Sequence, residues 1–195
     1  MKDITHWKKK INEKLSTLCC VEEKLGVIKI KCDSKDIVNI STILNKEFDV
    51  NGFIGAFGTH YQNAESIVEL RYMFISYKEN FRVEIAAEIK DGMSALSLTD
   101  LYSGAEWYER EIFDMLGVKF SDLKDHRRIL TDYNFEHHPL RKDFPVVGYN
   151  EVRYDFLSGE VRYFENNFSQ DYKQFDSNMQ IDTKAVFDKI KTTNS

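Results

Sequence analysis

The sequence predicts an α+β fold in which helices pack on one face of a mixed or antiparallel sheet. Three runs typical of β-strands follow one another at residues 53–60, 66–77 and 81–89. The last two runs are separated only by residues 78–80, which is short enough for a hairpin. Apolar residues at helical spacing come before and after these strands, and that order is typical of a two-layer domain.

The chain before these strands predicts a helix, a strand and a second helix. Apolar residues recur at three- and four-residue spacing from Ile4 to Leu18, which predicts an amphipathic helix that ends near Gly26. Alternation at residues 27–32 predicts a strand. Residues 33–34 are an Asp and a Ser, which favour the start of a helix, and an apolar stripe follows them.

The clearest helix follows the strands. Its start resembles a capping box at residues 97–100, and Gly117 is suited to end it. Glu106, Arg110 and Asp114 stand at four-residue steps, so they form a ladder of alternating charge along one side of the helix. By itself, such a ladder predicts a solvated helix face.

The chain changes character after this helix. Both of its prolines, Pro139 and Pro145, lie within residues 123–149, where aromatic residues sit among paired charges and no period is sustained. A segment of this kind is suited to lie along the surface of another protein. We therefore expect a core domain at residues 1–120, followed by an extended partner-wrapping segment and tail at residues 121–195.

The composition argues against several partners. The net charge is −5 and the basic residues are dispersed, whereas binding nucleic acid needs a basic surface. The longest charge-free stretch, Val50 to Ala64, holds too many polar residues to cross a bilayer, so we expect no direct membrane span. The start of the chain lacks the features of a signal or transit peptide. Cys19, Cys20 and Cys32 have neither a disulfide framework nor cluster-ligand spacing, which favours free thiols.

A metal site is the main catalytic alternative. His126, His137 and His138 lie among carboxylates, and imidazole with carboxylate can ligate zinc or iron. Two of these histidines are adjacent, however, and cannot both face one ion on regular backbone. Glu109 and Glu111 diverge by about 200° around a helix, so they do not form an acid–base pair. We therefore expect no catalytic residue, metal or cofactor in this chain.

Four linked motifs between Trp107 and Tyr154 resemble those of a known family. The motifs are Trp107-Tyr108-Glu109-Arg110-Glu111 with Phe113-Asp114-Met115 and Gly117-Val118, then Arg127-Arg128-Ile129-Leu130-Thr131-Asp132-Tyr133, then His138-Pro139-Leu140-Arg141-Lys142-Asp143-Phe144-Pro145, then Gly148-Tyr149 with Glu151-Val152-Arg153-Tyr154. In order and spacing they resemble the signature of the 30-kDa subunit family of respiratory complex I, NADH:ubiquinone oxidoreductase. The members of this family are NADH dehydrogenase subunit 9 in mitochondria and the C subunit of NADH-quinone oxidoreductase in bacteria.

The sequence departs from the pattern of that family at three places. Residues 123–126 replace a usual His-Pro-Asp-Leu, His137 stands where Gly is usual, and Asn166 replaces a Pro. If the backbone at His137 needs a positive φ, the turn there is strained by about 1 kcal/mol. None of the departures falls on a cofactor position, because the family has none in this subunit.

The resemblance implies a non-catalytic core subunit of the quinone module, in the peripheral arm of the proton-translocating NADH:ubiquinone reductase. Such a subunit scaffolds the subunits that carry electrons from NADH to ubiquinone. The implied partners are the core subunit related to nickel–iron hydrogenase large subunits and the neighbouring iron–sulfur subunit. The FMN and iron–sulfur clusters of the complex would lie on other subunits.

The resemblance also implies that the motif residues form subunit interfaces or ion pairs within the chain. The residues so assigned are Trp107, Tyr108, Glu109, Arg110, Glu111, Asp114, Gly117, Arg127, Arg128, Asp132, Tyr133, Pro139, Arg141, Lys142, Asp143, Phe144 and Pro145. Arg127 and Arg128 are adjacent and should point to opposite sides. We expect one of them to pair with Asp114 or Asp143, and the other to reach a carboxylate of a partner.

Two alternatives stay open beside this interpretation. The chain could be the matching subunit of a membrane hydrogenase or of a dehydrogenase with another donor, or a free-standing metalloenzyme that uses its histidines. The abundance of Lys, Asn, Ile, Phe and Tyr, whose codons are AT-rich, favours an organellar gene. The expected location is therefore the matrix side of the mitochondrial inner membrane, with the cytoplasmic face of a bacterial membrane as the alternative.

Overall fold

The computed structural model describes residues 4–62 and 67–166. The chain forms two compact units, Met1–Pro145 and Val146–Ser195. This division falls later than the boundary expected after residue 120, because residues 121–145 pack on the first unit. The polar tail expected at the end of the chain lies outside the described residues.

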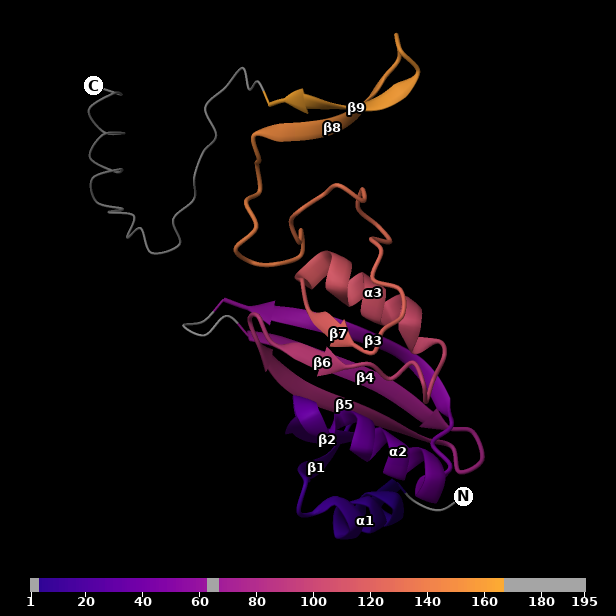
Figure 1. Ribbon diagram of the computed structural model, residues 1–195. Helices are drawn as coiled ribbons and strands as arrows, with labels where there is room; N and C mark the ends of the chain where they lie inside the picture. The colour runs from indigo at the N-terminus through magenta and orange to yellow at the C-terminus, as the bar shows by residue number, and fades with distance from the viewer. Residues whose placement is uncertain (1–3, 63–66, 167–195) are drawn as a thin grey trace, which may run out of the picture. The chain divides into compact units, whose positions relative to one another are not determined.

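The first unit is built on a five-stranded mixed sheet with the strand order β1-β2-β5-β4-β3 (Figure 1). The strands are β1 (Cys19–Lys24), β2 (Val27–Asp33), β3 (Gly52–Tyr61), β4 (Ile67–Ser76) and β5 (Phe81–Lys90). β2 and β5 are parallel, whereas the other neighbours are antiparallel. The mixed sheet, the three predicted strands and the hairpin between the last two are thus confirmed.

The helices lie along the sheet from its β1 edge to its β3 edge (Figure 1). They are α1 (Ile4–Leu15), α2 (Ile37–Phe48), which follows the short 3-10 turn η1 (Ser34–Asp36), and α3 (Ala105–Leu116). Trp7 of α1 stacks on Phe81 of β5, with ring centroids 5.1 Å apart. The Tyr72 hydroxyl of β4 donates to the Glu109 carboxylate of α3. Phe81 and Tyr72 lie on the same face of the sheet, so α1 and α3, which are far apart in the sequence, cover one face together.

The two faces of the sheet differ in character. One row across all five strands consists of Val21, Ile30, Ile85, Tyr72 and Ala56, and every one of these side chains is buried. The opposite face carries ion pairs between neighbouring strands, such as Glu84 with Lys29 and with Arg71, both at 3.1 Å. The expected layer of helices on one face is therefore confirmed.

The N-terminal helix is shorter than predicted. It ends at Leu15, and the N–H of Leu18 donates to the carbonyl of Leu15 in a turn that leads into β1. β1 then pairs with β2 through a tight turn at Leu25 and Gly26, which both adopt positive φ. Leu18 continues the helical spacing, and Leu25 is an unusual residue for such a turn, so the sequence pattern concealed the strand.

Further differences lie around α3. The helix begins at Ala105 rather than at residue 98, and residues 98–102 form a separate turn before it. Gly117 ends the helix as predicted, with φ +82° and its N–H donating to the carbonyl of Phe113. The strands β6 (Ser94–Leu96) and β7 (Lys119–Ser121) form a parallel pair that was not predicted, because each is only three residues long.

The second unit contains a hairpin, which was not predicted within the extended partner-wrapping segment and tail expected at residues 121–195. Its strands are β8 (Asn150–Asp155) and β9 (Glu160–Glu165). The carboxylate of Asp155 accepts the Leu157 N–H and the Ser158 hydroxyl at 3.0 and 2.9 Å, which fixes the turn. A two-stranded hairpin is at best marginally stable by itself.

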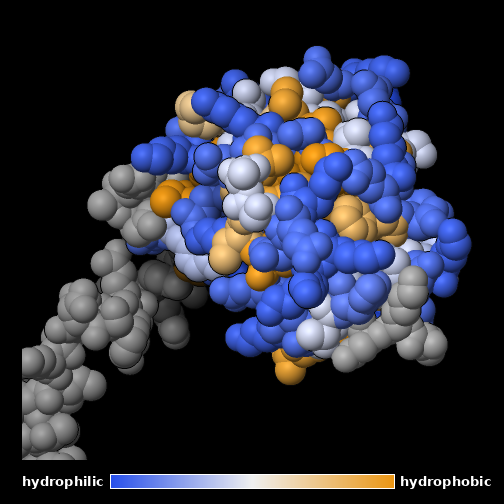
Figure 2. Space-filling view, turned by 90° about the horizontal axis from the view of Figure 1, so that it is seen from below, coloured by the Kyte–Doolittle hydropathy of each residue, from blue (hydrophilic) through white to orange (hydrophobic). Residues whose placement is uncertain are grey.

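Seen from below, the surface is mostly hydrophilic, and its apolar residues occur in small separate groups (Figure 2). Within the described ranges, no helix combines the length and the apolar character that crossing a bilayer requires.

Candidate subunit interface

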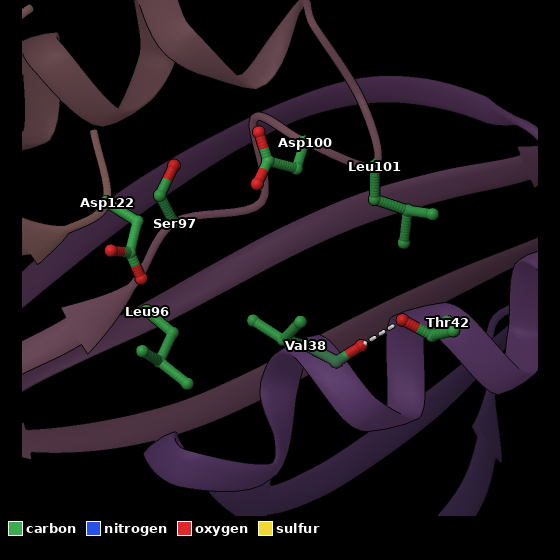
Figure 3. Close-up of a pocket in the computed structure, with 7 residues that line it drawn as sticks. All are labelled: Val38, Thr42, Leu96, Ser97, Asp100, Leu101 and Asp122. Atoms are coloured by element: carbon green, nitrogen blue, oxygen red, sulfur yellow. Dashed lines mark hydrogen bonds between the residues drawn. The ribbon is translucent and has the colours of Figure 1, made fainter. Parts of the chain in front are cut away.

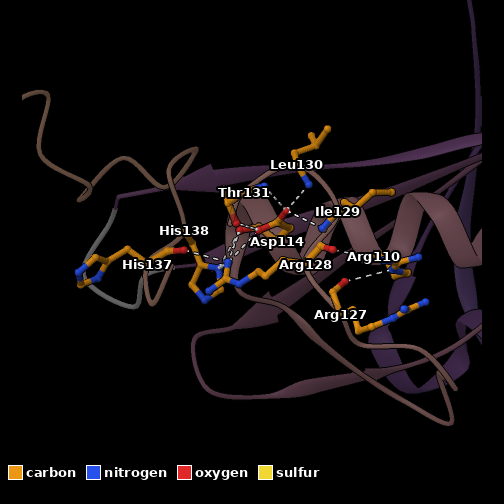
Figure 4. Close-up of polar contacts among 9 residues, drawn as sticks. All are labelled: Arg110, Asp114, Arg127, Arg128, Ile129, Leu130, Thr131, His137 and His138. Carbon is orange, nitrogen blue, oxygen red and sulfur yellow. Dashed lines mark hydrogen bonds and ion pairs between the residues drawn. The ribbon is translucent and has the colours of Figure 1, made fainter. Parts of the chain in front are cut away.

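Asp114, near the end of α3, is the centre of a hydrogen-bond network that holds residues 122–145 against the helix (Figure 4). Its side chain is completely buried. One carboxylate oxygen accepts the backbone N–H groups of residues 129–131 at 2.7–3.0 Å. The other accepts the Thr131 hydroxyl at 2.5 Å and the Arg128 guanidinium at 2.9 Å.

The network determines the charge of Asp114. Burial by itself would raise the pKa of this carboxyl, but the hydrogen bonds from Thr131, Leu130 and Arg128 outweigh it and hold the pKa well below its usual range. Asp114 is therefore an anion at neutral pH, and its negative charge is matched by the donors around it.

Arg128 supplies the cation of the network. Its Nη1 also donates to the backbone carbonyls of Asp114 and His137 at 3.0 and 2.9 Å, and its guanidinium lies over the Phe113 ring. The Nδ1 of His138 lies 2.9 Å from the carbonyl of Asp114. Of the two acids expected to pair with one of the adjacent arginines, Asp114 and Asp143, the structure places Asp114 beside Arg128.

Arg110 fixes the beginning of the same segment. Its side chain is 8% exposed and donates to the carbonyls of Arg127 and Arg128 at 3.1 and 3.3 Å. It also pairs with Asp125 at 3.3 Å and lies over the Trp107 ring. The predicted solvated charge ladder is therefore wrong, because its Arg110 and Asp114 are buried by a segment that the helical spacing could not reveal.

The second arginine of the pair, Arg127, has a different environment. Its side chain is 70% exposed and forks onto the carboxylate of Asp125, two residues earlier, with contacts of 2.8–3.1 Å. An exposed ion pair of this kind contributes little to stability, because water screens its charges. Whether Arg127 reaches a carboxylate of a partner stays a prediction.

The far end of the segment is anchored to the sheet. The N–H of Leu140 donates to the carbonyl of Met115 at 3.0 Å, and that of Lys142 donates to Nδ1 of the buried His60 at 2.8 Å. Arg141 forms ion pairs with Asp91, beyond the end of β5, and with Asp143, both at 2.9 Å. Residues 122–145 are thus held at both ends and in the middle.

Two backbone positions in this region bear on the expected strain. Gly117 has φ +82°, and a Cβ built there would lie 2.6 Å from the His138 ring, so a side chain is excluded for two reasons. His137, where the family usually has Gly, is not among the residues with positive φ. The strain considered for His137 is therefore absent.

Glu109 is buried on another side of α3. Its carboxylate accepts the Ser97 hydroxyl at 2.6 Å, the Leu98 N–H at 2.9 Å and the Tyr72 hydroxyl at 3.4 Å. Burial raises the pKa of Glu109, and the three hydrogen bonds act in the opposite direction. The predicted capping box is not formed at the start of α3. The Ser97 hydroxyl oxygen accepts the Thr99 N–H at 3.1 Å, but it does so in the turn before the helix, and the Ser97 N–H donates to the carbonyl of Ser121 rather than to Asp100.

The other predicted site residues divide by exposure. Phe144 and Pro139 are partly buried. The exposed ones are Trp107, Tyr108, Glu111, Asp132, Tyr133, Lys142, Asp143 and Pro145. In the second and third motifs, the exposed Leu130 and Leu140 were not among the predicted site residues. They could have been identified from the sequence, because they are large apolar residues in a segment that has many charged residues and no helical or strand period.

A cavity of about 280 Å³ lies between α2 and the connection that precedes α3 (Figure 3). Its lining residues are Val38, Thr42, Leu96, Ser97, Asp100, Leu101 and Asp122. The hydroxyl of Ser97 is already engaged by Glu109 and Thr99. In the described part of the chain, no three His, Cys, Asp or Glu side chains are grouped to hold a metal ion.

Comparisons with known proteins agree with the sequence motifs. The profile of the family described as respiratory-chain NADH dehydrogenase, 30 Kd subunit, matches residues 30–150. The C subunit of NADH-quinone oxidoreductase from Agrobacterium fabrum is 38% identical over 77% of this chain and 76% of its own length. The same subunit from Wolbachia of Brugia malayi is 43% identical over 64% of this chain and 65% of its own.

Two solved structures share the fold. A chain of the membrane-bound sulfane sulfur reductase, an archaeal respiratory membrane complex, has a TM-score of 0.66 and 21% identity, and the match covers 75% of this chain and 88% of that one. A trypsin-resistant fragment of Nqo5 has a TM-score of 0.52 and 18% identity, with 64% of this chain and 99% of the fragment covered. From the profile match and the sequence relatives, the chain belongs to the family of the 30-kDa subunit of respiratory-chain NADH dehydrogenase.

Proposed function

We propose that this chain is a non-catalytic scaffold subunit in the peripheral arm of an NADH:quinone oxidoreductase. Membership of the 30-kDa subunit family supports the assignment to this enzyme, as do the relatives that are C subunits of NADH-quinone oxidoreductases. Other subunits of the complex carry the FMN and the iron–sulfur clusters, transfer electrons from NADH to quinone and couple that transfer to proton translocation.

The main observation in support of the scaffold role is that the charged motif residues bind other parts of this chain. Asp114, Arg110, Arg128 and Arg141 direct their charged groups at other parts of this chain, where they fix residues 122–145. Groups engaged in this way order a surface and are not directed at a substrate. Their contribution is to hold one conformation of the segment before a partner binds, which lowers the entropy cost of association.

The same motifs present apolar groups outward. Trp107 is 60% exposed, Leu130 65%, Tyr133 74% and Leu140 59%. Aromatic and leucine side chains held in place by a rigid network are suited to fill pockets of a partner, and such anchors dominate the energy of protein interfaces. We call these four residues the motif apolar residues.

The partners proposed for this surface are the subunit related to nickel–iron hydrogenase large subunits and the neighbouring iron–sulfur subunit of the quinone module. The bacterial relatives favour a location on the cytoplasmic face of a bacterial membrane, with the chain attached through these partners. The matrix side of the mitochondrial inner membrane, which the residue composition favours, is the alternative.

The proposal is tested in cells that lack this subunit and receive variants of it. Arg128→Ala leaves the buried Asp114 without its cation, so we expect the amount of assembled complex on native gels to fall while NADH:quinone activity per assembled complex stays normal. Lys124→Ala, a change of an exposed residue of the same segment, is the matched control and should assemble normally. Normal assembly with lost turnover for Arg128→Ala would contradict the scaffold role. If the chain were purified from cells with its bound partners and no NADH-oxidising activity came with them, the assignment to this enzyme would be contradicted.

A further inference from the structure

The five-stranded sheet has two outer edges that differ in their protection. The β1 edge is six residues long and carries Glu22, Glu23 and Lys24. The β3 edge is ten residues long, from Gly52 to Tyr61, and carries no charged residue and no proline. Soluble proteins usually protect edge strands with charges, prolines, bulges or a covering element, because an open edge pairs with other strands. The β3 edge therefore lacks the charges and prolines that usually prevent such pairing.

The outward backbone groups of β3 are located by its neighbours. β3 pairs with β4 on one side, and within the described ranges no strand pairs with its other side. Near its start there is a bulge between Phe53 and Gly55, and the hydroxyl of Tyr108 from α3 donates to the carbonyl of Ile54 at 3.4 Å. The bulge and Tyr108, whose ring also lies beside Gly55, protect that end, and the Lys142 N–H that binds His60 places residues of the 122–145 segment near the other end. In the described part of the chain no further strand covers the stretch Gly55–Tyr61.

The side chains of this stretch fit a strand that continues the sheet. Ala56 and His60 are buried on the helix-covered face. Phe57 and Tyr61 lie on the opposite face and are 47% and 45% exposed. An added strand would place its own side chains beside these two aromatic rings, and cross-strand neighbours of this kind stabilise a sheet.

We propose that an extended segment of another subunit of the complex pairs with β3 along Gly55–Tyr61 and adds a sixth strand to the sheet. The outward N–H and C=O groups select an extended peptide, because only that conformation presents matching groups at the strand repeat. The choice of another subunit rests on the proposed function. Position supports the same choice, because Tyr108, which covers the start of β3, adjoins the exposed Trp107, one of the motif apolar residues proposed to face a partner.

Amide hydrogen exchange of the full-length chain, alone and in the purified complex, tests the proposal. In an edge strand alternate amides point outward and exchange quickly. We expect the outward amides of residues 55–61 to exchange at least roughly a hundredfold more slowly in the complex. The outward amides of β1 are the internal control and should not change.

Three results would overturn this inference. Outward β3 amides that stay fast in the complex would show that no strand is added. Protection already present in the isolated chain at every concentration would assign the edge to a segment of this chain. Protection that rises with the concentration of the isolated chain would assign it to a second copy. In each case the chain still co-purifies with NADH-oxidising activity, whereas loss of that association would contradict the proposed function itself.

A charge placed at the edge gives an independent measurement. Phe57→Lys puts a cation among the side chains that the added strand would bring. When it competes with the wild-type chain for assembly, we expect its incorporation to fall roughly tenfold. Glu22→Lys makes the matched change at the β1 edge and should be incorporated like wild type. Equal incorporation of Phe57→Lys would overturn the inference.

Discussion

The sheet with its three helices and the segment of residues 122–145 are ordered by different forces. In the first, apolar side chains from every strand and helix form one continuous core. In the second there is no helix or strand. Leu123, at its start, joins that core, and the order of the rest comes mainly from hydrogen bonds and ion pairs to α3, His60 and Asp91. Apolar burial is spread over many residues, whereas the polar anchoring depends on a few.

The two regions should therefore respond differently to a substitution. Loss of one core side chain weakens a cooperative unit, so the whole first unit should unfold more easily. Loss of one anchoring group should release residues 122–145 and leave the sheet folded. Two of the four family motifs, residues 127–133 and 138–145, lie in the second kind of region, where a single substitution should alter the surface without unfolding the domain.

The largest effect on global stability is expected for Phe74→Ala. Phe74 is 1% exposed and contacts the rings of Phe53, Tyr72 and Tyr102. Deletion of such a side chain costs about 3–5 kcal/mol through lost transfer energy and the cavity left behind. Chemical denaturation should show this loss with an unchanged denaturant slope. A loss below about 1 kcal/mol would show that the core is not the cooperative unit described.

Asp114→Ala is expected to act locally. If the segment stayed in place, the unpaired Arg128 and three backbone N–H groups would cost about 3–5 kcal/mol. Release of the segment into water limits that cost, so the global free energy of unfolding should fall by less than for Phe74→Ala. Hydrogen exchange should become fast at residues 129–131 and stay slow in β4 and β5.

Glu111→Ala, an exposed change on the same helix, is the control for Asp114→Ala and should leave both regions unchanged within about 0.5 kcal/mol. Fast exchange throughout β4 and β5 in Asp114→Ala would contradict the separation of the two regions.

Gly117→Ala should have a smaller effect. Its backbone at φ +82° disfavours a side chain by about 1 kcal/mol, and the new Cβ would contact the ring of His138. We expect thermal unfolding to show a loss of roughly 1–3 kcal/mol, accompanied by faster exchange near His138. Gly148→Ala is the control, because its nearest neighbour would lie at an ordinary 3.7 Å. Equal stability of the two variants would contradict the close contact between α3 and His138.

The sequence predicted the core far better than the site. The strands β3 to β5 could be predicted from runs of strand-forming residues, and α2 from its apolar stripe. β1 was missed because Leu18 prolongs the helical spacing, and the start of α3 was misplaced because Leu98 and Leu101 share the period of the helix. Local patterns are reliable where apolar burial determines structure.

The polar network could not be predicted in the same way. Glu106, Arg110 and Asp114 have the spacing of a solvated ladder, and only a non-local segment shows that two of them are buried. The motif match located the region, and the pairing of Arg128 with Asp114 was one of the expected alternatives. The donors at residues 129–131 are backbone N–H groups. Every residue except proline has one, so a sequence pattern cannot show which of them bind Asp114.

The most direct test of the account uses an exposed motif residue whose removal should not affect folding. Tyr133 is 74% exposed and Tyr77, on the turn after β4, is 71% exposed, so Tyr133→Ser and Tyr77→Ser form a matched pair. The measurement is incorporation into the complex in competition with the wild-type chain, beside the stability of each isolated variant. The account predicts that both variants keep their stability within about 0.5 kcal/mol and that only Tyr133→Ser loses incorporation. Full incorporation of Tyr133→Ser would contradict the claim that the anchored segment presents the surface on which partners assemble.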